Sequence, residues 1–317
     1  MSKAENSQYD LIIAGAGPAG LSAAQYAARA GMSVLILGNP AGSQAARISS
    51  LENYPGIFPA SDGFSFLDAM KRQALEFGAK AEFKTISSIV KSDSEEAICT
   101  VNADGTDYTA GAVLIATGAE HRKLGIPGEQ EFLGRGVSYC ATCDGPFFRG
   151  KDVIVIGGGD SACAEALFLS KICRSVTVIH RKSQFRAQKS LAQSVLNSSS
   201  IKVLFNCTVE RIDGTEKVET AAVKNSADGT SEKITADGIF ISIGTVPAQT
   251  FFSGIKTDES GYIVTDEMMQ TSVPGIFAAG DIRSKSFRQV VTACSDGATA
   301  AHAAFSYLSK VRNEVYK

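Results

Sequence analysis

Two cysteines three residues apart are the part of this 317-residue chain best suited to redox chemistry. They are the first and fourth residues of the run CATCDG, which extends from Cys140 to Gly145. Thiols at this spacing can close an intrachain disulfide and lower each other's pKa. Asp144 follows directly and could move the proton that thiol–disulfide exchange requires. We therefore take Cys140, Cys143 and Asp144 as candidate catalytic residues.

Two alternatives compete with a redox role for this pair, namely half of a zinc site or two buried thiols. Zinc would need a second pair of ligands. The remaining cysteines and the histidines instead stand singly: Cys99, Cys163, Cys173, Cys207, Cys294, His121, His180 and His302. We therefore predict no metal. Cys163 and Cys173 lie on or beside an apolar stretch and are assigned packing roles.

Two glycine-rich runs have the spacing of dinucleotide-binding turns. Each lies between an expected strand and an expected helix, which is the context that the motif requires. The glycines allow a tight turn, a close approach of backbone to pyrophosphate, and close packing of helix on strand. Free N–H groups at the helix start then bind the phosphate charge. The candidates are Gly15, Gly17, Pro18, Ala19 and Gly20 in the first run, and Gly157, Gly159, Asp160, Ser161 and Ala162 in the second.

The first run lacks one usual feature of such sites. A ribose-binding acid is expected about 20 residues after the glycines. That position holds Gly38 and Asn39. Ribose recognition must therefore come from elsewhere, and Gln44 is a candidate.

The second run is followed at the same position by basic residues. His180, Arg181 and Lys182 come first, and Arg186 lies shortly after them. Cations suit the 2′-phosphate of NADP, which an acid would repel. The alternative is a solvated basic loop, but the position at the end of a strand favours phosphate. Two unequal sites indicate two dinucleotides, NADPH and a flavin dinucleotide.

The elements around these motifs repeat, which indicates an internal duplication. The first copy has strands over 9–14, 33–37, 98–101, 106–109 and 113–118, and a helix over 21–30. The second has strands over 153–156, 176–179, 218–223, 231–234 and 239–244, and a helix over 163–171. About 70 residues remain after Pro247, with a strand and turn over 275–281 and a helix over 290–308.

That tail is too small for a core of its own, so we expect it to complete the first domain. The predicted fold is α/β, with two Rossmann-like dinucleotide-binding domains. The second domain is inserted into the first, and each carries a β-meander.

Composition excludes several classes of protein. Lysine and arginine number 31 against 33 aspartates and glutamates, so nucleic acid is not an expected partner. No apolar run is long enough to span a membrane, and residues 1–10 lack the order of a secretory signal. Seven cysteines in 317 residues do not form a secreted disulfide framework. We expect a cytoplasmic location.

Together these residues resemble the low-molecular-weight, bacterial-type thioredoxin reductases of the flavin pyridine-nucleotide disulfide oxidoreductase superfamily. The most specific feature is the position of CATCDG inside the nucleotide half of the chain rather than near the N-terminus. The segments that carry the resemblance are Gly15–Gly20, Glu52–Gly56, Ala116–Gly118, Cys140–Gly145, Gly157–Ala162, His180–Ala187, Gly275–Asp281 and Arg288–Gln289.

The resemblance implies an FAD-binding domain, residues 1–118 and 247–317, and an NADPH-binding domain, residues 119–246, that carries the redox pair. It adds FAD-binding candidates, with Asp281 as the ribityl contact: Asn53, Ala116, Thr117, Gly118, Gly280, Asp281, Arg288 and Gln289. Hydride would pass from NADPH to FAD, then to the Cys140–Cys143 disulfide and on to thioredoxin. Cys143 would lie nearer the flavin. Family members are homodimers whose domains swing between two geometries.

Three departures from the family pattern stand out. Lys182 replaces an arginine and lacks its planar fork for phosphate, so NADPH preference could be softer. Ala164 replaces the first of two glutamates and leaves Glu165, and the segment Gly42–Gln44 replaces Gly-Gly-Gln. Two other functions remain open: a reductase that serves a peroxidase-linked or other thioredoxin-like protein, and a flavin- and NADPH-binding redox sensor without turnover.

Overall fold

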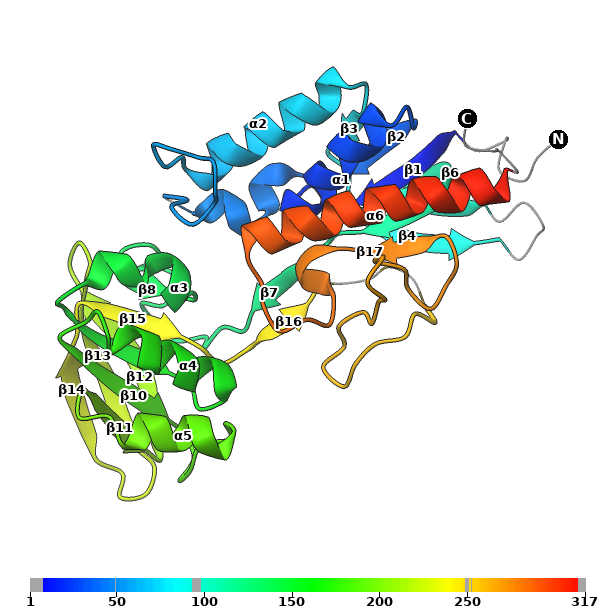
Figure 1. Ribbon diagram of the computed structural model, residues 1–317. Coiled ribbons are helices and arrows are strands. Elements are labelled where there is room, and N and C mark those ends of the chain that lie inside the picture. The colour runs from blue at the N-terminus through cyan, green and yellow to red at the C-terminus, as the bar shows by residue number, and fades with distance from the viewer. Residues whose placement is uncertain (1–7, 49, 93–97, 249–250, 252, 313–317) are drawn as a thin grey trace. The chain divides into compact units, whose positions relative to one another are not determined.

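The chain divides into two compact units, one of which is discontinuous in sequence (Figure 1). The computed structural model describes residues 8–48, 50–92, 98–248, 251 and 253–312. Unit 1 comprises Met1–Glu120 and Val246–Lys317, and unit 2 comprises His121–Thr245. The chain crosses between them through β7 (Ala119–His121) and β16 (Thr245–Pro247), which pair with each other.

Unit 1 is built on one seven-stranded sheet. Its elements are β1 (Tyr9–Ala14), α1 (Pro18–Arg29), β2 (Val34–Leu37), η1 (Pro40–Gly42), η2 (Gln44–Arg47), α2 (Gly63–Glu76), β3 (Lys80–Glu82), β4 (Ile86–Lys91), β5 (Cys99–Ala103), β6 (Thr106–Ile115), β17 (Ile276–Ala278), η4 (Gly280–Ile282) and α6 (Val290–Val311). The strand order is β3-β2-β1-β6-β5-β4, and β17 pairs with β6. Strands β3, β2, β1, β6 and β17 pair in parallel, whereas β4, β5 and β6 form an antiparallel meander.

The central strands of unit 1 are apolar on both faces because both faces are covered. Leu11 and Ile13 of β1 belong to one buried cluster together with residues of α1, α2 and α6. Ile12 and Ala14 point to the opposite face and join a second cluster with residues of β4 and β5. This arrangement fixes the carboxyl end of β1, where the first glycine turn begins.

Helix α6 lies directly against α1 (Figure 1). The Ser22 hydroxyl donates to the carbonyl of Cys294 over 2.8 Å. A Cβ on Gly297 would overlap the carbonyl oxygen of Ala19, so this close approach requires glycine. The C-terminal segment therefore completes the core of unit 1, as expected from its length.

Unit 2 repeats the same plan. Its elements are β8 (Val137–Ser138), α3 (Ala141–Asp144), η3 (Gly145–Phe148), β9 (Asp152–Ile156), α4 (Asp160–Leu169), β10 (Ser175–His180), α5 (Lys189–Leu196), β11 (Ile201–Phe205), β12 (Cys207–Gly214), β13 (Val218–Asn225), β14 (Ser231–Thr235) and β15 (Gly238–Ile241). A parallel sheet has the order β11-β10-β9-β15-β8, and an antiparallel meander has the order β12-β13-β14.

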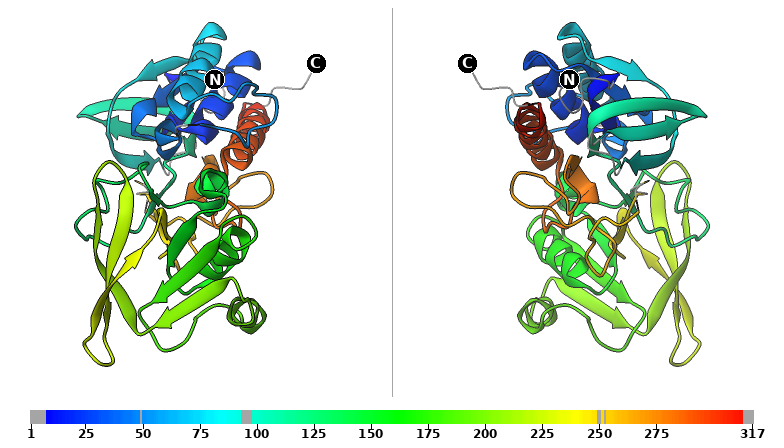
Figure 2. Two further views of the ribbon diagram at one scale, coloured as in Figure 1. Left: turned by 90° about the vertical axis from the view of Figure 1, so that its left-hand side faces the viewer. Right: turned by 90° about the vertical axis from the view of Figure 1, so that its right-hand side faces the viewer.

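The two sheets of unit 2 face each other (Figure 2), and the side chains between them form a shared apolar layer. Ile154 and Ile179 of the parallel sheet belong to one cluster with Val209 and Val223 of the meander. The opposite face of the parallel sheet packs against α4 and α5. The prediction of two Rossmann-like units, each with a meander and the second inserted into the first, is confirmed.

One detail of the sequence analysis was wrong. The strands expected over 106–109 and 113–118 are one strand, β6, because Ala110 pairs with both Cys99 of β5 and Tyr9 of β1. Several elements were not predicted, among them α2, α5, β4, β11 and β12. For α2 a signal was present, since Asp62 caps the helix by accepting from the Ser65 N–H over 2.9 Å.

Candidate functional site

Cys140 and Cys143 form a disulfide at the start of α3, with their Cα atoms 5.3 Å apart. Cys140 is the N-cap residue of α3, and its Sγ accepts from the Cys143 N–H over 3.2 Å. Both residues are partly exposed. This geometry fits a redox-active disulfide.

Asp144 ends α3, and its environment favours a proton. Burial raises the pKa of this carboxyl, while a hydrogen bond from Ser138 acts in the opposite direction. The Ser138 hydroxyl donates to Asp144 Oδ2 over 2.6 Å. The sequence analysis missed Ser138, although a serine just before a redox cysteine was a visible signal.

Glu165 on α4 is a second carboxyl near the redox pair that the sequence analysis did not include among site residues. Burial raises its pKa to about 7, although the Ser242 side chain and the Ala141 backbone both hydrogen-bond to it. Its Oε2 is buried without a hydrogen-bond partner in the described part of the chain. Ala141 is the first residue of α3, so the Glu165 carboxyl contacts the helix that follows Cys140 and contains Cys143.

Glu165 should make the stability of the protein depend on pH. Between its ordinary pKa of 4.5 and the folded-state value of about 7, the folded protein holds a proton that the unfolded chain has lost. The free energy of unfolding of the wild type should therefore fall, relative to Glu165→Gln, by about 2–3 kcal/mol as the pH rises through this window.

Urea unfolding of the FAD-saturated protein at pH 4.5 to 8 measures this difference. Glu131→Gln, at an exposed position of the same unit, is the matched control and should keep the wild-type pH dependence. A constant difference between wild type and Glu165→Gln across the window would show that Glu165 ionises normally.

The second glycine run forms the turn between β9 and α4. A Cβ on Gly157 would overlap the carbonyl oxygen of Ser242, and one on Gly158 would overlap the ring of His180. A Cβ on Gly159, by contrast, would have no neighbour within 4 Å. The backbone at Gly159 is therefore open to a ligand, at the start of a helix whose N–H groups favour phosphate.

The basic residues of the second site stand beside this turn. The Arg186 N–H donates to the carbonyl of Gly158 over 2.7 Å, which holds Arg186 against the glycines. The side chains of Arg181, Lys182 and Arg186 are exposed and form no ion pair within the described residues. Three cations without acidic partners next to a phosphate-type turn suit a phosphate monoester.

The other predicted residues of this site differ in exposure. His180 is 5% exposed, and its ring stacks on Phe185, so it packs beneath the turn. Burial lowers the pKa of His180, and the three cations beside it act in the same direction. Asp160 Oδ1 accepts from the Gln188 N–H over 2.7 Å, which ties the start of α4 to the loop before α5. Ser161 is exposed, and Ala162 packs beneath Gly157.

The first glycine run forms the equivalent turn between β1 and α1. A Cβ on Gly15 would overlap the carbonyl oxygen of Ala116, and one on Gly20 would overlap that of Gly15. A Cβ on Gly17 would approach only the Ser43 side chain, at 3.3 Å. Pro18 begins α1, so its missing N–H leaves no helical hydrogen bond unmade. This cradle fits a pyrophosphate.

A buried ionic cluster organises the turn at Gly280. Asp296 accepts from the Gly280 N–H over 3.0 Å and pairs with Arg283 at 2.9 Å and Lys285 at 3.0 Å. Lys285 also lies 3.5 Å from Asp281 Oδ1. That oxygen is buried with Lys285 as its charged neighbour, and burial raises the pKa of Asp281 although Lys285 acts in the opposite direction. An acceptor in this state suits a ligand hydroxyl.

Further candidates of the first site are brought together from distant segments. Asn53 Nδ2 donates to Gln289 Oε1 over 3.0 Å, across 236 residues of sequence. Gln289 is the N-cap of α6 in a capping box with Thr292. Arg288 places its guanidinium 4.2 Å from the ring centre of Tyr262.

The remaining candidates surround the end of β6. Gln44 Nε2 donates to the carbonyl of Ala119. Ala116, Thr117 and Gly118 follow β6, and Gly118 has φ +78°, a conformation that favours glycine. This segment therefore lies next to the cradle at Gly15.

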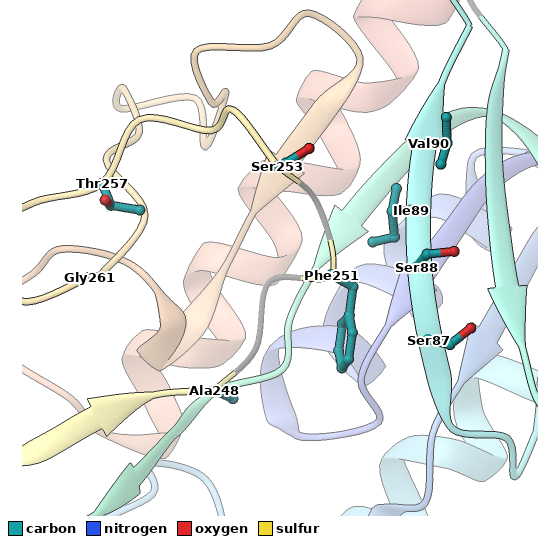
Figure 3. A pocket seen from close by; sticks show the side chains of 9 residues that line it. All are labelled: Ser87, Ser88, Ile89, Val90, Ala248, Phe251, Ser253, Thr257 and Gly261. Carbon is teal, nitrogen blue, oxygen red and sulfur yellow. The ribbon is translucent and has the colours of Figure 1, made fainter.

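Other features of the described residues carry no chemistry of this kind. A surface pocket of about 650 Å³ lies in unit 1 between β4 and a wall that includes Ala248, Phe251 and Thr257, and its lining residues are uncharged (Figure 3). The described helices include none with the length and apolar character that a membrane crossing requires. Among the same residues, no group of three or more histidines, cysteines and carboxylates could hold a metal ion.

Comparisons with known proteins agree with this arrangement. Residues 9–297 match the pyridine nucleotide-disulphide oxidoreductase family. The thioredoxin reductase of Treponema pallidum is 53% identical over 96% of this chain and 99% of its own, and that of Bacillus subtilis is 43% identical over 97% of each. The crystal structure of the Streptococcus pyogenes enzyme has a TM-score of 0.89 at 38% identity, covering 96% of this chain and 100% of that one. The chain belongs to the pyridine nucleotide-disulphide oxidoreductase family and, within it, to the thioredoxin reductases.

Proposed function

We propose that this chain is an NADPH-dependent, FAD-containing reductase that transfers electrons to the disulfide of a thioredoxin. The observation that carries the proposal is the Cys140–Cys143 disulfide, which begins α3 and has the Asp144 carboxyl at the end of the same helix. The relatives described above carry the name thioredoxin reductase. The chain is similar to them over nearly its whole length.

The two nucleotides divide between the units. FAD binds unit 1, where the backbone at Gly17 receives the pyrophosphate and Asp281 accepts from a ribityl hydroxyl. NADPH binds unit 2, where Arg181, Lys182 and Arg186 hold the 2′-phosphate. FAD, when bound, supplies the two-electron chemistry that links NADPH to the disulfide.

Helix α6 contributes charge to the first site. Its 22 residues present the positive end of the helix dipole at Gln289. Arg288 adds a full positive charge beside this end. Together they would favour a negatively charged group on a cofactor bound at this site.

The redox pair completes the cycle by thiol–disulfide exchange. Two electrons break the Sγ–Sγ bond, and uptake of two protons gives two thiols. One thiolate attacks the partner's disulfide and forms a mixed disulfide, and the second sulfur then displaces the partner as a dithiol. Asp144 carries a proton in these steps. The disulfide–dithiol couple of thioredoxin has a reduction potential of about −270 mV and can accept these electrons.

The partner and setting follow from the same assignment. A small protein with a thioredoxin-like disulfide is the substrate, and two copies of this chain form the working enzyme. The near-neutral net charge does not favour binding to nucleic acid. The sparse cysteines suit the reducing cytoplasm.

The purified protein should be yellow with FAD absorption and should oxidise NADPH slowly on its own. Addition of the thioredoxin from the same organism should stimulate NADPH oxidation by about 100-fold or more. The assay follows absorbance at a wavelength specific to NADPH, with a thioredoxin that lacks its two cysteines as the control. A yellow protein without stimulation would favour a redox sensor over an enzyme.

A further inference from the structure

Ser138 is buried between the two parts of the redox site. It is the last residue of β8, is 3% exposed, and pairs with Phe240 of β15. A parallel sheet holds its backbone, and hydrogen bonds to two neighbouring residues hold its hydroxyl. The residue is neither a cysteine nor a carboxyl, and it takes no part in the proposed electron transfer.

The Ser138 hydroxyl connects Cys140 to Asp144. It accepts from the Cys140 N–H over 3.0 Å and donates to Asp144 Oδ2 over 2.6 Å. The carbonyl of Cys140 lies further away, at 3.4 Å. A hydroxyl has one proton to donate, and the shorter bond to a carboxylate is the stronger of the two.

Other ionisable groups near α3 are few. Helix α4, which packs against α3, carries Asp160, Cys163 and Glu165. The turn η3, which also packs against α3, carries none. Apart from the redox sulfurs, the contact that acts on Asp144 against burial is the hydrogen bond from Ser138.

We propose that Ser138 is a positioning residue that holds the Asp144 carboxyl against the Cys140 backbone and stabilises its ionised form. Ser138 thereby sets the pH range in which Asp144 can deliver a proton to a leaving sulfur. The inference rests on the proposed function, which makes Asp144 the proton carrier. It adds the residue that controls this carrier.

The test measures how fast dithiothreitol reduces the Cys140–Cys143 disulfide in the FAD-loaded protein from pH 3.5 to pH 9. New thiols are trapped with iodoacetamide and located by mass spectrometry. In this exchange a dithiothreitol thiolate attacks one sulfur, and the other leaves as a thiolate that needs a proton. Dividing each rate by that of Asp144→Asn removes the ionisation of dithiothreitol itself.

The normalised rate should fall with rising pH as Asp144 loses its proton. The rate of Ser138→Ala is divided by that of the double variant Ser138→Ala/Asp144→Asn. Its fall should occur at a pH about one unit higher than in the wild type, because a hydrogen bond to a charged group is lost. Ser138→Thr keeps a hydroxyl and should retain the wild-type profile. Ser170→Ala removes a partly buried hydroxyl just after α4 that donates to the Leu167 carbonyl, and it should change nothing.

Two results would overturn the proposal. One is an unshifted fall in Ser138→Ala, and the other is an equal effect of Ser138→Ala with and without the Asp144 carboxyl. Flavin absorption and melting temperature confirm that each variant is folded. Because the assay uses neither NADPH nor thioredoxin, a shifted fall in a protein that thioredoxin does not stimulate would contradict the proposed function alone.

Discussion

Cys143→Ser should lower NADPH-dependent reduction of thioredoxin by at least about 1,000-fold. A serine hydroxyl cannot form the disulfide that stores the two electrons, so no other residue can complete the exchange. The expected phenotype is specific, because Cys143 is partly exposed at the start of α3 and contributes little to the core. FAD absorption and melting temperature should therefore stay close to those of the wild type.

Thioredoxin-coupled NADPH oxidation measures this loss. Cys173→Ser is the matched control, since Cys173 is a partly exposed free thiol of the same unit, and it should retain full activity. Turnover by Cys143→Ser within about tenfold of the wild type would remove the redox pair from the mechanism.

The double variant Arg181→Ala/Arg186→Ala should lose about 100-fold or more in kcat/KM for NADPH. Each arginine is expected to make a charge-assisted hydrogen bond to the 2′-phosphate, and each such bond contributes about 1.5–3 kcal/mol. NADH lacks this phosphate, so its kcat/KM should change by less than about threefold. Preference between the two nucleotides would then nearly vanish.

Steady-state kinetics with both nucleotides test this prediction. Lys202→Ala is the control, because Lys202 is an exposed cation of the neighbouring strand β11, paired with Thr177 rather than with the end of β10. Equal losses with NADPH and NADH would show that the arginines act on folding or on the shared part of the nucleotide.

The sequence was most informative where function depends on a local backbone conformation. The run from Gly15 to Gly20 forms a tight turn in which Gly15 has φ +117°, and the backbone at Gly17 is open. Such requirements are met by residues next to each other in the chain. Strand–turn–helix context therefore predicted both turns, and the spacing of Cys140 and Cys143 predicted their disulfide.

The sequence was least informative where residues meet across elements. Glu165 reaches the Ala141 backbone from another helix, and only burial raises its pKa. Asp296 lies within α6 and accepts a hydrogen bond from the Gly280 N–H. The residues beside Asp296 in the sequence are those of an ordinary helix and do not indicate this contact. Strand β6 could not be recognised as continuous, because its first half pairs with a meander and its second with parallel strands. Burial and register depend on the whole fold.

The central claim is that reducing equivalents from NADPH arrive at one pair of sulfurs in this chain. The most direct measurement adds NADPH stepwise to the FAD-loaded protein without oxygen, labels thiols with iodoacetamide and maps the labels by mass spectrometry. We predict that label appears at Cys140 and Cys143, while the labelling of the five other cysteines stays as it was before NADPH. Oxidation of NADPH and bleaching of the flavin without label at these two positions would contradict the account.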